Sequence, residues 1–433
     1  MKKILAVLLV VLFLVPAVFA GGSKEAGVVT STDKDPKTLT VWAWDPNFNI
    51  AALKAAEKIY QEDHPDFKLN IVEYVYNDIQ TNLIAAAEAG DISTLPDIFL
   101  MQDYQFHTYA NRYPEVFTDL TDSGIDFADF TAGKAADSNV NGMQYGVPFD
   151  NSTTIFAIRK DIVEMAGFTV EDFDQITWDD FIAKARVVKE KTGHPMITIS
   201  GGSEIIIEIL QSAGTDSPVV DGKLNIAGNE VLMKAFEIYK TMYDEGILID
   251  YTDWNEYIAS MNTGVTGGVI QGCWILGSIE AAADQSGLWR VVTIPRLGDV
   301  AGATNYANIG GSSWVVSGNA NKELAIDFLK STFGSSTALY DTVLESNSVI
   351  ASYLPAASSS LYNEEVPFYG GQKVYADIVE FAGNVPAVDY GNWYNEIRDA
   401  LNVALTNIVQ NGADIATELE NAEATVDFAI SAL

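Results

Sequence analysis

Apolar residues alternate between two spacings along the first part of the chain. Short β-rich runs at residues 38–44, 68–74 and 97–100 are separated by segments whose apolar side chains recur at helical spacing. This order of strand, helix, strand, helix and strand predicts a parallel sheet that is covered by helices. We therefore expect an α/β fold.

Helical patterns dominate the rest of the chain, and strand patterns are fewer. A capping box that begins at Thr177 predicts a helix through Lys191. Further helices are predicted at 230–245, 322–333, 393–410 and 415–430, and short strands at 268–270, 291–294 and 313–316. No single linker divides the sequence, which indicates lobes that are built from interleaved segments.

Residues 1–20 are typical of a secretory signal peptide. Two lysines precede an apolar run, Pro16 ends the run, and Val18 and Ala20 supply the small residues of a cleavage site after Ala20. The run is shorter than the ~20 residues of a membrane-spanning helix. No cysteine stands directly after the cleavage site, so lipid attachment there is excluded, and residues 21–35 form a polar, flexible leader. We expect an exported protein, in the periplasm or at the cell surface.

The balance of charges limits the kinds of partner that the protein can bind. The 433 residues include 25 Lys and Arg against 59 Asp and Glu, which gives a net charge of −34. Such a field repels phosphate backbones and anionic lipids, so we expect no nucleic-acid partner.

A single cysteine argues against an internal disulfide and a cysteine-rich metal site. Neither a phosphate loop, a nucleophile elbow nor a zinc-protease motif is present, and we expect no cofactor.

Candidate binding residues stand where the predicted strands end. In open parallel α/β sheets, ligands bind beyond the carboxyl ends of the strands. The first strand leads into Trp44 and Asp45, and the third leads into Asp103 and Tyr104. An aromatic ring can stack on the C–H face of a sugar, while a carboxylate accepts hydrogen bonds from neighbouring hydroxyls. An equally open alternative places Trp44 in the core and makes Asp45 a helix cap.

Two further tryptophans stand at the ends of predicted elements. Trp274 follows a strand pattern, and Trp393 opens a helix pattern, so each could line an aromatic cleft. Packing in the core or against a helix is the competing interpretation for any single tryptophan. Several of them at element ends, in a chain with 8 Trp and 19 Tyr, favour a cleft.

Six short motifs follow one another along the chain. They are N-G-M-Q-Y-G-V-P at 141–148, I-R-K-D at 158–161 with A-G at 166–167, T-W-D-D-F at 177–181, G-C-W at 272–274, G-G at 310–311 and N-K-E-L-A at 321–325. In this order they resemble the sugar-binding family of extracellular solute-binding proteins of bacterial ABC importers, which includes maltose-binding protein. The resemblance runs from about residue 38 to the C-terminus. Ile158 and Arg159 depart from the Tyr-Asn that is usual in this family.

This resemblance implies a two-lobed periplasmic-binding-protein fold with interleaved lobes, a hinge and a central ligand cleft. Lobe one would comprise residues 36–147 plus 306–350, and lobe two residues 148–305 plus 351–433. Together with the strand ends, the resemblance gives the candidate ligand-binding residues Trp44, Asp45, Asp103, Tyr104, Asp150, Asn151, Trp274, Gly311 and Trp393.

The predicted function is capture of a carbohydrate by closure of two lobes and its delivery to the permease subunits of an ABC transporter. We expect a monomer that binds a sugar or oligosaccharide and is not an enzyme. One alternative is the same fold binding a polyamine or other cationic solute, because aromatic rings and carboxylates also suit amines. The other is an exported polysaccharide-active hydrolase, which needs a paired acid and nucleophile. The sequence does not name the sugar.

Overall fold

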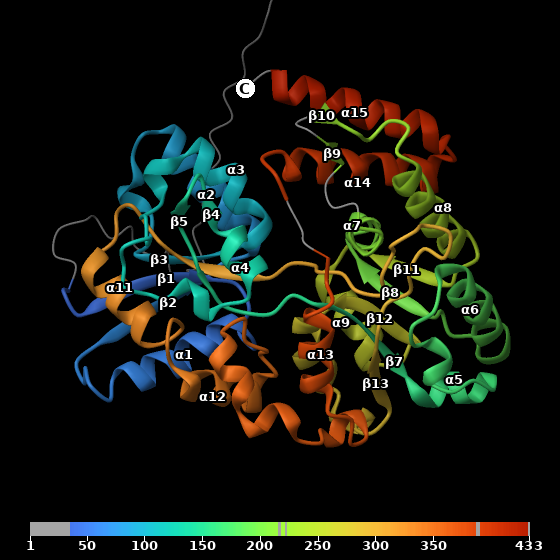
Figure 1. The fold of residues 1–433 in the computed structure, drawn as a ribbon, viewed down its shortest axis with the longest axis horizontal. Coiled ribbons are helices and arrows are strands. Elements are labelled where there is room, and N and C mark those ends of the chain that lie inside the picture. Colours follow the sequence, from blue (N-terminus) through green and yellow to red (C-terminus); the bar gives the residue numbers. More distant parts are fainter. Residues whose placement is uncertain (1–34, 215–217, 221–222, 387–389, 432–433) are drawn as a thin grey trace, which may run out of the picture. The chain divides into compact units, whose positions relative to one another are not determined.

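The computed structural model describes residues 35–214, 218–220, 223–386 and 390–431 (Figure 1). The predicted signal peptide lies outside these residues, as does the predicted leader except for Asp35. Pro36–Leu433 forms one compact unit that contains two five-stranded sheets. We call the part built around the first sheet lobe one and the part built around the second sheet lobe two.

The first sheet has the strand order β2-β1-β3-β14-β6. Its strands are β1 (Thr38–Ala43), β2 (Lys68–Glu73), β3 (Ile98–Gln102), β6 (Val147–Pro148) and β14 (Ser312–Val316). β1 pairs in parallel with β2 and β3, which confirms the parallel arrangement that the sequence predicts for these three strands. β14 is antiparallel to both β3 and β6. The carboxyl ends of β3 and β6 therefore lie beside the beginning of β14.

Helices cover both faces of the first sheet (Figure 1). Successive residues of a strand point to opposite faces, so Val41 packs in one helix layer and Trp42 in the other. One layer consists of α1 (Asn49–Tyr60), α11 (Lys322–Ser331) and α12 (Thr337–Asn347), and the other of α2 (Tyr76–Glu88) and α3 (Phe106–Arg112).

The second sheet has the strand order β11-β8-β12-β7-β13. Its strands are β7 (Thr154–Arg159), β8 (Ile197–Ser200), β11 (Leu248–Tyr251), β12 (Gly268–Gly272) and β13 (Trp289–Val292). The sequence pattern misses β7, β8 and β11. All six residues of β7 are buried, so the strand shows no apolar–polar alternation, and four-residue strands such as β8 and β11 are too short to show a period.

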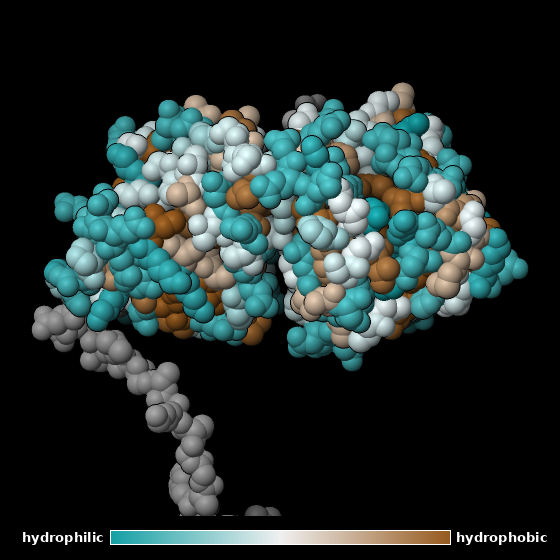
Figure 2. Space-filling view, turned by 90° about the horizontal axis from the view of Figure 1, so that it is seen from below, coloured by the Kyte–Doolittle hydropathy of each residue, from teal (hydrophilic) through white to brown (hydrophobic). Residues whose placement is uncertain are grey.

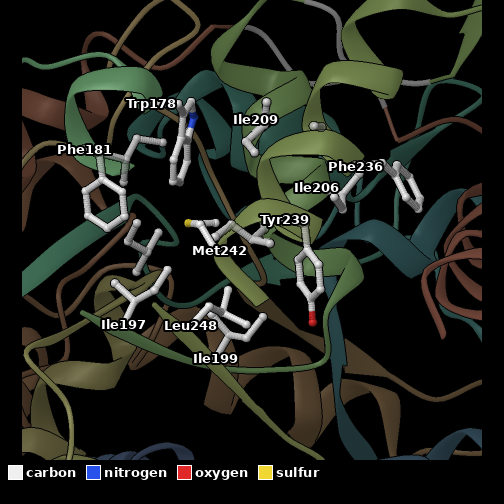
Figure 3. Close-up of a cluster of buried hydrophobic side chains, with 14 of the residues drawn as sticks. Trp178, Phe181, Ile197, Ile199, Ile206, Ile209, Phe236, Tyr239, Met242 and Leu248 are labelled. Carbon is white, nitrogen blue, oxygen red and sulfur yellow. The ribbon is translucent and has the colours of Figure 1, made fainter. Parts of the chain in front are cut away.

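Helices also cover both faces of the second sheet. One layer consists of α5 (Lys160–Ala166), α6 (Trp178–Thr192), α7 (Ser203–Ser212), α8 (Glu230–Asp244), α14 (Tyr394–Asn411) and α15 (Ile415–Ser431), and the other of α9 (Trp254–Asn262), α10 (Leu276–Glu280) and α13 (Val374–Ala382). Figure 3 shows Trp178 of α6 and Met242 of α8 in the same apolar cluster as Ile197 of β8. Thr177 caps α6 by accepting a hydrogen bond from the Asp180 amide, as the capping box predicts.

The remaining elements are short. Two-stranded sheets are formed by β4 (Asn139–Val140) with β5 (Met143–Gln144) and by β9 (Val219–Val220) with β10 (Lys223–Leu224). Short helical turns are α4 (Ala132–Asp137), η1 (Ile92–Thr94), η2 (Asp103–Gln105), η3 (Pro114–Val116), η4 (Phe127–Asp129), η5 (Glu171–Phe173), η6 (Cys273–Ile275), η7 (Ala283–Gln285), η8 (Leu354–Ser358), η9 (Ser360–Asn363) and η10 (Pro367–Tyr369). Among the described residues, no helix combines the length and the apolar character of a membrane span.

Several chain segments pass from one sheet to the other, and these segments lie side by side between the lobes. The first, residues 149–153, joins β6 to β7, and the second, residues 293–311, joins β13 to β14. Isolated bridges connect Thr153 with Asn308 in these two segments, and Asp150 with Ala351 in a third segment, residues 348–353, which joins α12 to η8. Interleaved lobes are therefore a property of the fold, while the residue boundaries given for each lobe stay a prediction.

Candidate functional site

A cleft of about 1640 Å³ is lined by residues of both lobes. Its walls are the segments that follow β1, β2 and β3 in lobe one and those that follow β8, β11 and β12 in lobe two. Figure 2 shows a mostly hydrophilic surface with a furrow between the two halves of the molecule. The cleft thus lies where the rule for open α/β sheets expects a ligand, beyond the carboxyl ends of the strands.

Trp44 and Asp45 form part of the lobe-one wall. Both are half-buried, and the side-chain oxygen of Asn49 accepts hydrogen bonds from the amides of Trp44 (3.2 Å) and Asp45 (3.1 Å), which holds the end of β1. The Trp44 ring packs edge-on against Tyr76, with centroids 5.0 Å apart. Asp45 Oδ1 accepts a hydrogen bond from the Asn47 amide at 2.8 Å. Trp44 is thus a cleft residue that packs against the edge of the core, rather than a buried core residue.

The lobe-two wall presents a pair of tryptophans. Trp274 is half-buried, and its indole N–H donates to the Ile309 carbonyl at 3.2 Å. Its ring lies 5.9 Å from that of Trp254, at an angle of 31°. Trp254 is 44% exposed and opens α9, directly after the capping residue Asp253. Sequence reasoning missed Trp254 because it did not recognise β11, although the strand-end rule applies to this residue too.

The floor of the cleft, as we call Asp150, Gly311 and Ser312, lies where β14 begins. Asp150 is buried, and its Oδ1 accepts hydrogen bonds from both the amide and the hydroxyl of Ser312, each at 2.8 Å. Burial raises the pKa of the Asp150 carboxyl, and the ammonium of Lys134 opposes that rise. Gly311 has a φ of +82°, in the region that favours glycine. The floor therefore offers a buried carboxylate whose orientation is set by the protein.

Asp103 does not line the cleft but lies beneath the floor, fully buried. It forms an ion pair with Lys134 of α4 and accepts a hydrogen bond from the Ser313 hydroxyl at 2.8 Å. Burial raises the pKa of Asp103 to about 6, although Lys134 opposes the rise. Asp103 is therefore not positioned to contact a ligand in the cleft. Lys134 carries no sequence signal of its own, because only packing brings it near Asp103.

Asn151 is also buried and is absent from the lining of the cleft. Its side-chain oxygen accepts hydrogen bonds from the amide (2.8 Å) and hydroxyl (2.6 Å) of Thr153, and its carbonyl accepts one from the Cys273 thiol at 3.2 Å. These contacts shape the first crossing segment. The side chain therefore organises the backbone next to Asp150.

Trp393 lies at the junction between α3 and α14 and is likewise absent from the cleft lining. The guanidinium carbon of Arg112 stands 5.5 Å from the centre of its ring, and Arg112 forms an ion pair with Glu396. The Thr108 hydroxyl also donates to the Asn392 carbonyl at 3.0 Å. Trp393 thus packs in a contact between the lobes.

Tyr104 lines the cleft and reaches across to lobe two. Its hydroxyl accepts a hydrogen bond from Arg398 at 2.7 Å, and its ring lies 4.9 Å from that of Tyr394. Arg398 also pairs with Glu204 at 3.4 Å, and Glu204 accepts a hydrogen bond from Gln271 at 3.1 Å. Sequence reasoning missed Arg398 and Glu204. For Arg398, the available signal was its place four residues after Tyr394, on the same face of α14.

Carboxylates outnumber cations among the described residues that line the cleft. The carboxylates are Asp45, Glu73, Asp150, Glu204 and Asp250, and the cation is Arg398. Burial raises the pKa of Glu204, while Arg398 lowers it. In the part of the chain that the structure describes, His, Cys, Asp and Glu side chains form no group of three or more that could hold a metal ion. The arrangement suits a ligand that donates hydrogen bonds and has apolar faces.

Comparisons with known proteins decide the family. The model of the bacterial extracellular solute-binding protein family matches residues 55–367. The chain is 36% identical over 387 residues to a lactose-binding protein of Rhizobium radiobacter, covering 89% of this chain and 91% of that protein. The chain belongs to the bacterial extracellular solute-binding proteins. The resemblance inferred from the six motifs is confirmed.

Solved structures of sugar-binding proteins share the fold of this solute-binding protein. One is the ABC transporter-associated binding protein of B. animalis subsp. lactis in complex with β-1,6-galactobiose, with a TM-score of 0.76 and 21% identity over 90% of this chain and 96% of that one. Another is maltose-bound MalE3 of T. maritima, with a TM-score of 0.74 and 15% identity over 90% and 99%. The two-lobed fold predicted from the sequence is confirmed. A solute-binding protein is not an enzyme, so the hydrolase alternative is set aside.

Proposed function

We propose that this solute-binding protein captures a disaccharide or short oligosaccharide between its lobes and delivers it to the permease subunits of an ABC transporter. The observation that carries the proposal is one cleft that combines aromatic rings from both lobes with a buried carboxylate. Trp44 stands on one wall, Trp254 and Trp274 stand on the other, and Asp150 lies in the floor. Rings can stack on sugar faces while carboxylates accept hydrogen bonds from hydroxyls.

Closure of the lobes would complete the site. A ligand favours the closed state only by contacts that are better in that state than in the open one. A sugar that touches Trp44 in lobe one and Trp274 in lobe two gains both contacts only when the lobes approach each other. The contact of Tyr104 with Arg398 and Tyr394 already joins the lobes beside the cleft. We propose that this contact belongs to the closed state.

The volume of the cleft and the charges of its lining limit the kinds of ligand that it could bind. Its volume of about 1640 Å³ exceeds the ~300–1,000 Å³ of common small-molecule pockets, which favours more than one sugar ring. Arg398 already forms an ion pair with Glu204 and a hydrogen bond with Tyr104. The described lining of the cleft therefore contains no unpaired cation that could bind an anionic sugar. A neutral sugar fits this balance. Lactose is the first candidate, because a relative at 36% identity is a lactose-binding protein.

A thermal-shift screen tests the proposal. The panel contains lactose, β-1,6-galactobiose, maltose and the polyamine spermidine. A ligand that binds only the folded protein stabilises it by RT ln(1 + [L]/Kd), which is about 2.7 kcal/mol at a concentration of 100 Kd. We expect at least one sugar to raise the midpoint and spermidine to leave it unchanged. A shift with spermidine and with no sugar would overturn the carbohydrate proposal in favour of a cationic solute.

We also propose that the protein acts outside the cytoplasm, in the periplasm or at the cell surface, as a monomer. The location outside the cytoplasm rests on the sequence of residues 1–20 and on the extracellular family. The intact mass of protein recovered from outside the cytoplasm should correspond to a chain that begins at Gly21. A mass that retains residues 1–20 would instead indicate tethering by an uncleaved presequence. Size-exclusion chromatography with light scattering should give the mass of a single chain.

A further inference from the structure

Three charged side chains form a buried cluster at the floor of the cleft: Asp150 belongs to the floor itself, and Asp103 and Lys134 lie beneath it. Each of the three is less than a tenth exposed. Lys134 forms an ion pair with Asp103 and lies close enough to the Ser312 carbonyl for a hydrogen bond of 3.4 Å. An ion pair removed from water costs several kcal/mol of desolvation per ion. Stability alone therefore gives no reason to keep these charges in the core.

The topology of the first sheet explains how the two carboxylates come together. Asp103 directly follows β3, and Asp150 follows β6 by two residues. β14 lies between β3 and β6 and runs antiparallel to both, with Ser312 opposite Gln102 and Ser313 opposite Pro148. Both carboxylates are therefore held at the first residues of β14, Asp150 by Ser312 and Asp103 by Ser313.

The backbone of Gly311 separates Lys134 and Asp103 from the cleft. A Cβ atom built on Gly311 would stand 2.5 Å from Lys134 Nζ and 2.6 Å from Asp103 Oδ2. Gly311 lines the cleft, whereas Lys134 and Asp103 do not. Its carbonyl also accepts a hydrogen bond from the Asp103 amide at 3.1 Å. Any movement of Lys134 or Asp103 would thus be transmitted to the backbone that faces the ligand.

The same backbone segment also positions the aromatic wall. The Trp274 indole donates to the carbonyl of Ile309, which is two residues before Gly311. A Cβ atom on Gly310 would stand 3.1 Å from that indole nitrogen. Residues 309–312 therefore connect Lys134 and Asp103 to both Asp150 and Trp274.

We propose that Lys134 is a positioning residue of the ligand site: through Asp103 and the Ser312 carbonyl it fixes the start of β14, and it supplies the positive charge beside the Asp150 carboxylate that accepts a sugar hydroxyl. This inference rests on the proposed function, because it takes Asp150 to contact the sugar. Lys134 itself stays beneath the floor and does not touch the ligand.

Among the residues that the structure describes, Lys134 is the cation that acts on both carboxylates. The other titratable groups that face it are Asp137 on α4, Cys273, Tyr340 and Tyr390. Burial raises the pKa of the thiol and of both phenols, so these three groups stay uncharged near neutral pH. Removing the ammonium leaves two buried carboxylates that repel each other, which raises the pKa of Asp150.

The test measures lactose affinity by calorimetry from about pH 5.5 to 8.5 in wild type, Lys134→Met and Lys134→Gln. If wild type does not bind lactose, the sugar that it binds in the panel replaces it. Met removes the charge and the donor, whereas Gln removes the charge but retains an N–H for Asp103. Lys234→Met is the matched control, because Lys234 forms a surface ion pair with Asp299 away from the cleft.

We expect both Lys134 variants to lose at least about tenfold in affinity at pH 7. The pH at which affinity is half lost should rise by about one unit or more, since an opposite charge nearby lowers a carboxyl pKa by ~1–3. Lys234→Met should match wild type.

A folded Lys134→Gln with the wild-type affinity and pH profile would overturn the proposal. Failure of both Lys134 variants to fold would also overturn it, because Lys134 would then serve stability rather than the site. Wild type that binds no sugar would instead contradict the proposed function.

Discussion

The floor and the lobe-two wall of the cleft are built in opposite ways. In the floor, Asp150 is buried and already hydrogen-bonded to Ser312, and Gly311 is packed against an ion pair. On the wall, Trp254 is 44% exposed and Trp274 is half-buried. If the proposed site is correct, the floor sets the direction of a hydrogen bond before a ligand binds, whereas the wall offers apolar area on which sugars of different linkage can stack. In the proposed site, the geometry would therefore come from the crossing segment and the start of β14, and the adaptability from the lobe-two wall.

The largest expected effect is that of Gly311→Ala, which would break the floor. A left-handed backbone costs an alanine roughly 1–2 kcal/mol, and the new Cβ would also collide with the Lys134–Asp103 pair. We expect sugar affinity to fall by about 100-fold or more, because displaced hydrogen bonds to charged groups are worth ~1.5–3 kcal/mol each. Gly142→Ala is the matched control, since Gly142 has a φ of +83° and nothing within 4 Å of its built Cβ. Equal losses of affinity in the two variants, measured by calorimetry, would contradict the role given to the floor.

Asp150→Asn should have the next largest effect. The amide can still accept a hydrogen bond from Ser312, but it loses the charge that strengthens a bond from a sugar hydroxyl. We expect a loss of about 1.5–3 kcal/mol in binding free energy, or roughly 10- to 150-fold in Kd. The comparison is Asp45→Asn, at a half-buried position on the lobe-one wall, for which we expect a smaller loss. A larger loss at Asp45 than at Asp150 in the same titration would reverse the contrast between buried and accessible carboxylates.

Trp274→Ala tests the lobe-two wall. If Trp274 is a buried anchor in the complex, its removal should cost ~2 kcal/mol or more, which is about 30-fold in affinity. Trp254→Ala should cost less, because Trp254 is the more exposed of the pair. Sugar titrations followed by the quenching of tryptophan fluorescence would measure both variants. Unchanged affinity in Trp274→Ala would remove this ring from the site.

Trp393→Ala should have the smallest effect on binding. Trp393 does not line the cleft and packs under Arg112 at the junction of α3 and α14. We expect sugar affinity within about twofold of wild type and a free energy of unfolding lower by about 1–2 kcal/mol. Denaturant titration and calorimetry on the same preparation would separate the two effects. A tenfold loss of affinity would return Trp393 to the ligand site, where the sequence places it.

The sequence-based site shows where strand ends are informative and where they are not. Trp44, Tyr104 and Trp274 follow strands and line the cleft. Asp103 also follows a strand, yet it turns inward to Lys134, 31 residues further along the chain. The position of a residue after a strand predicts which edge of the sheet it occupies. It does not predict whether the side chain points out to solvent or down into the core.

The missed residues have a common cause. Trp254 follows a four-residue strand that shows no period, and Arg398 lies inside a helix whose inner face is recognisable only once its neighbours are known. Lys134 belongs to a six-residue helix and meets Asp103 only because α4 packs against β6 and against η2, the turn that contains Asp103. Short elements and long-range contacts leave no periodic trace in the sequence.

The sequence by itself determined the α/β class, the parallel start of the first sheet and the aromatic residues at its strand ends. These features depend on local spacing, because apolar residues must recur at the period of the element that buries them. Only the tertiary structure decided which of the candidates share a cleft. Antiparallel β14 places Gly311 and Ser312 between the ends of β3 and β6, and this pairing joins Asp103 to Asp150 across strands that are far apart in the chain. Sites of this kind arise from strand order, which the apolar pattern of a single chain does not encode.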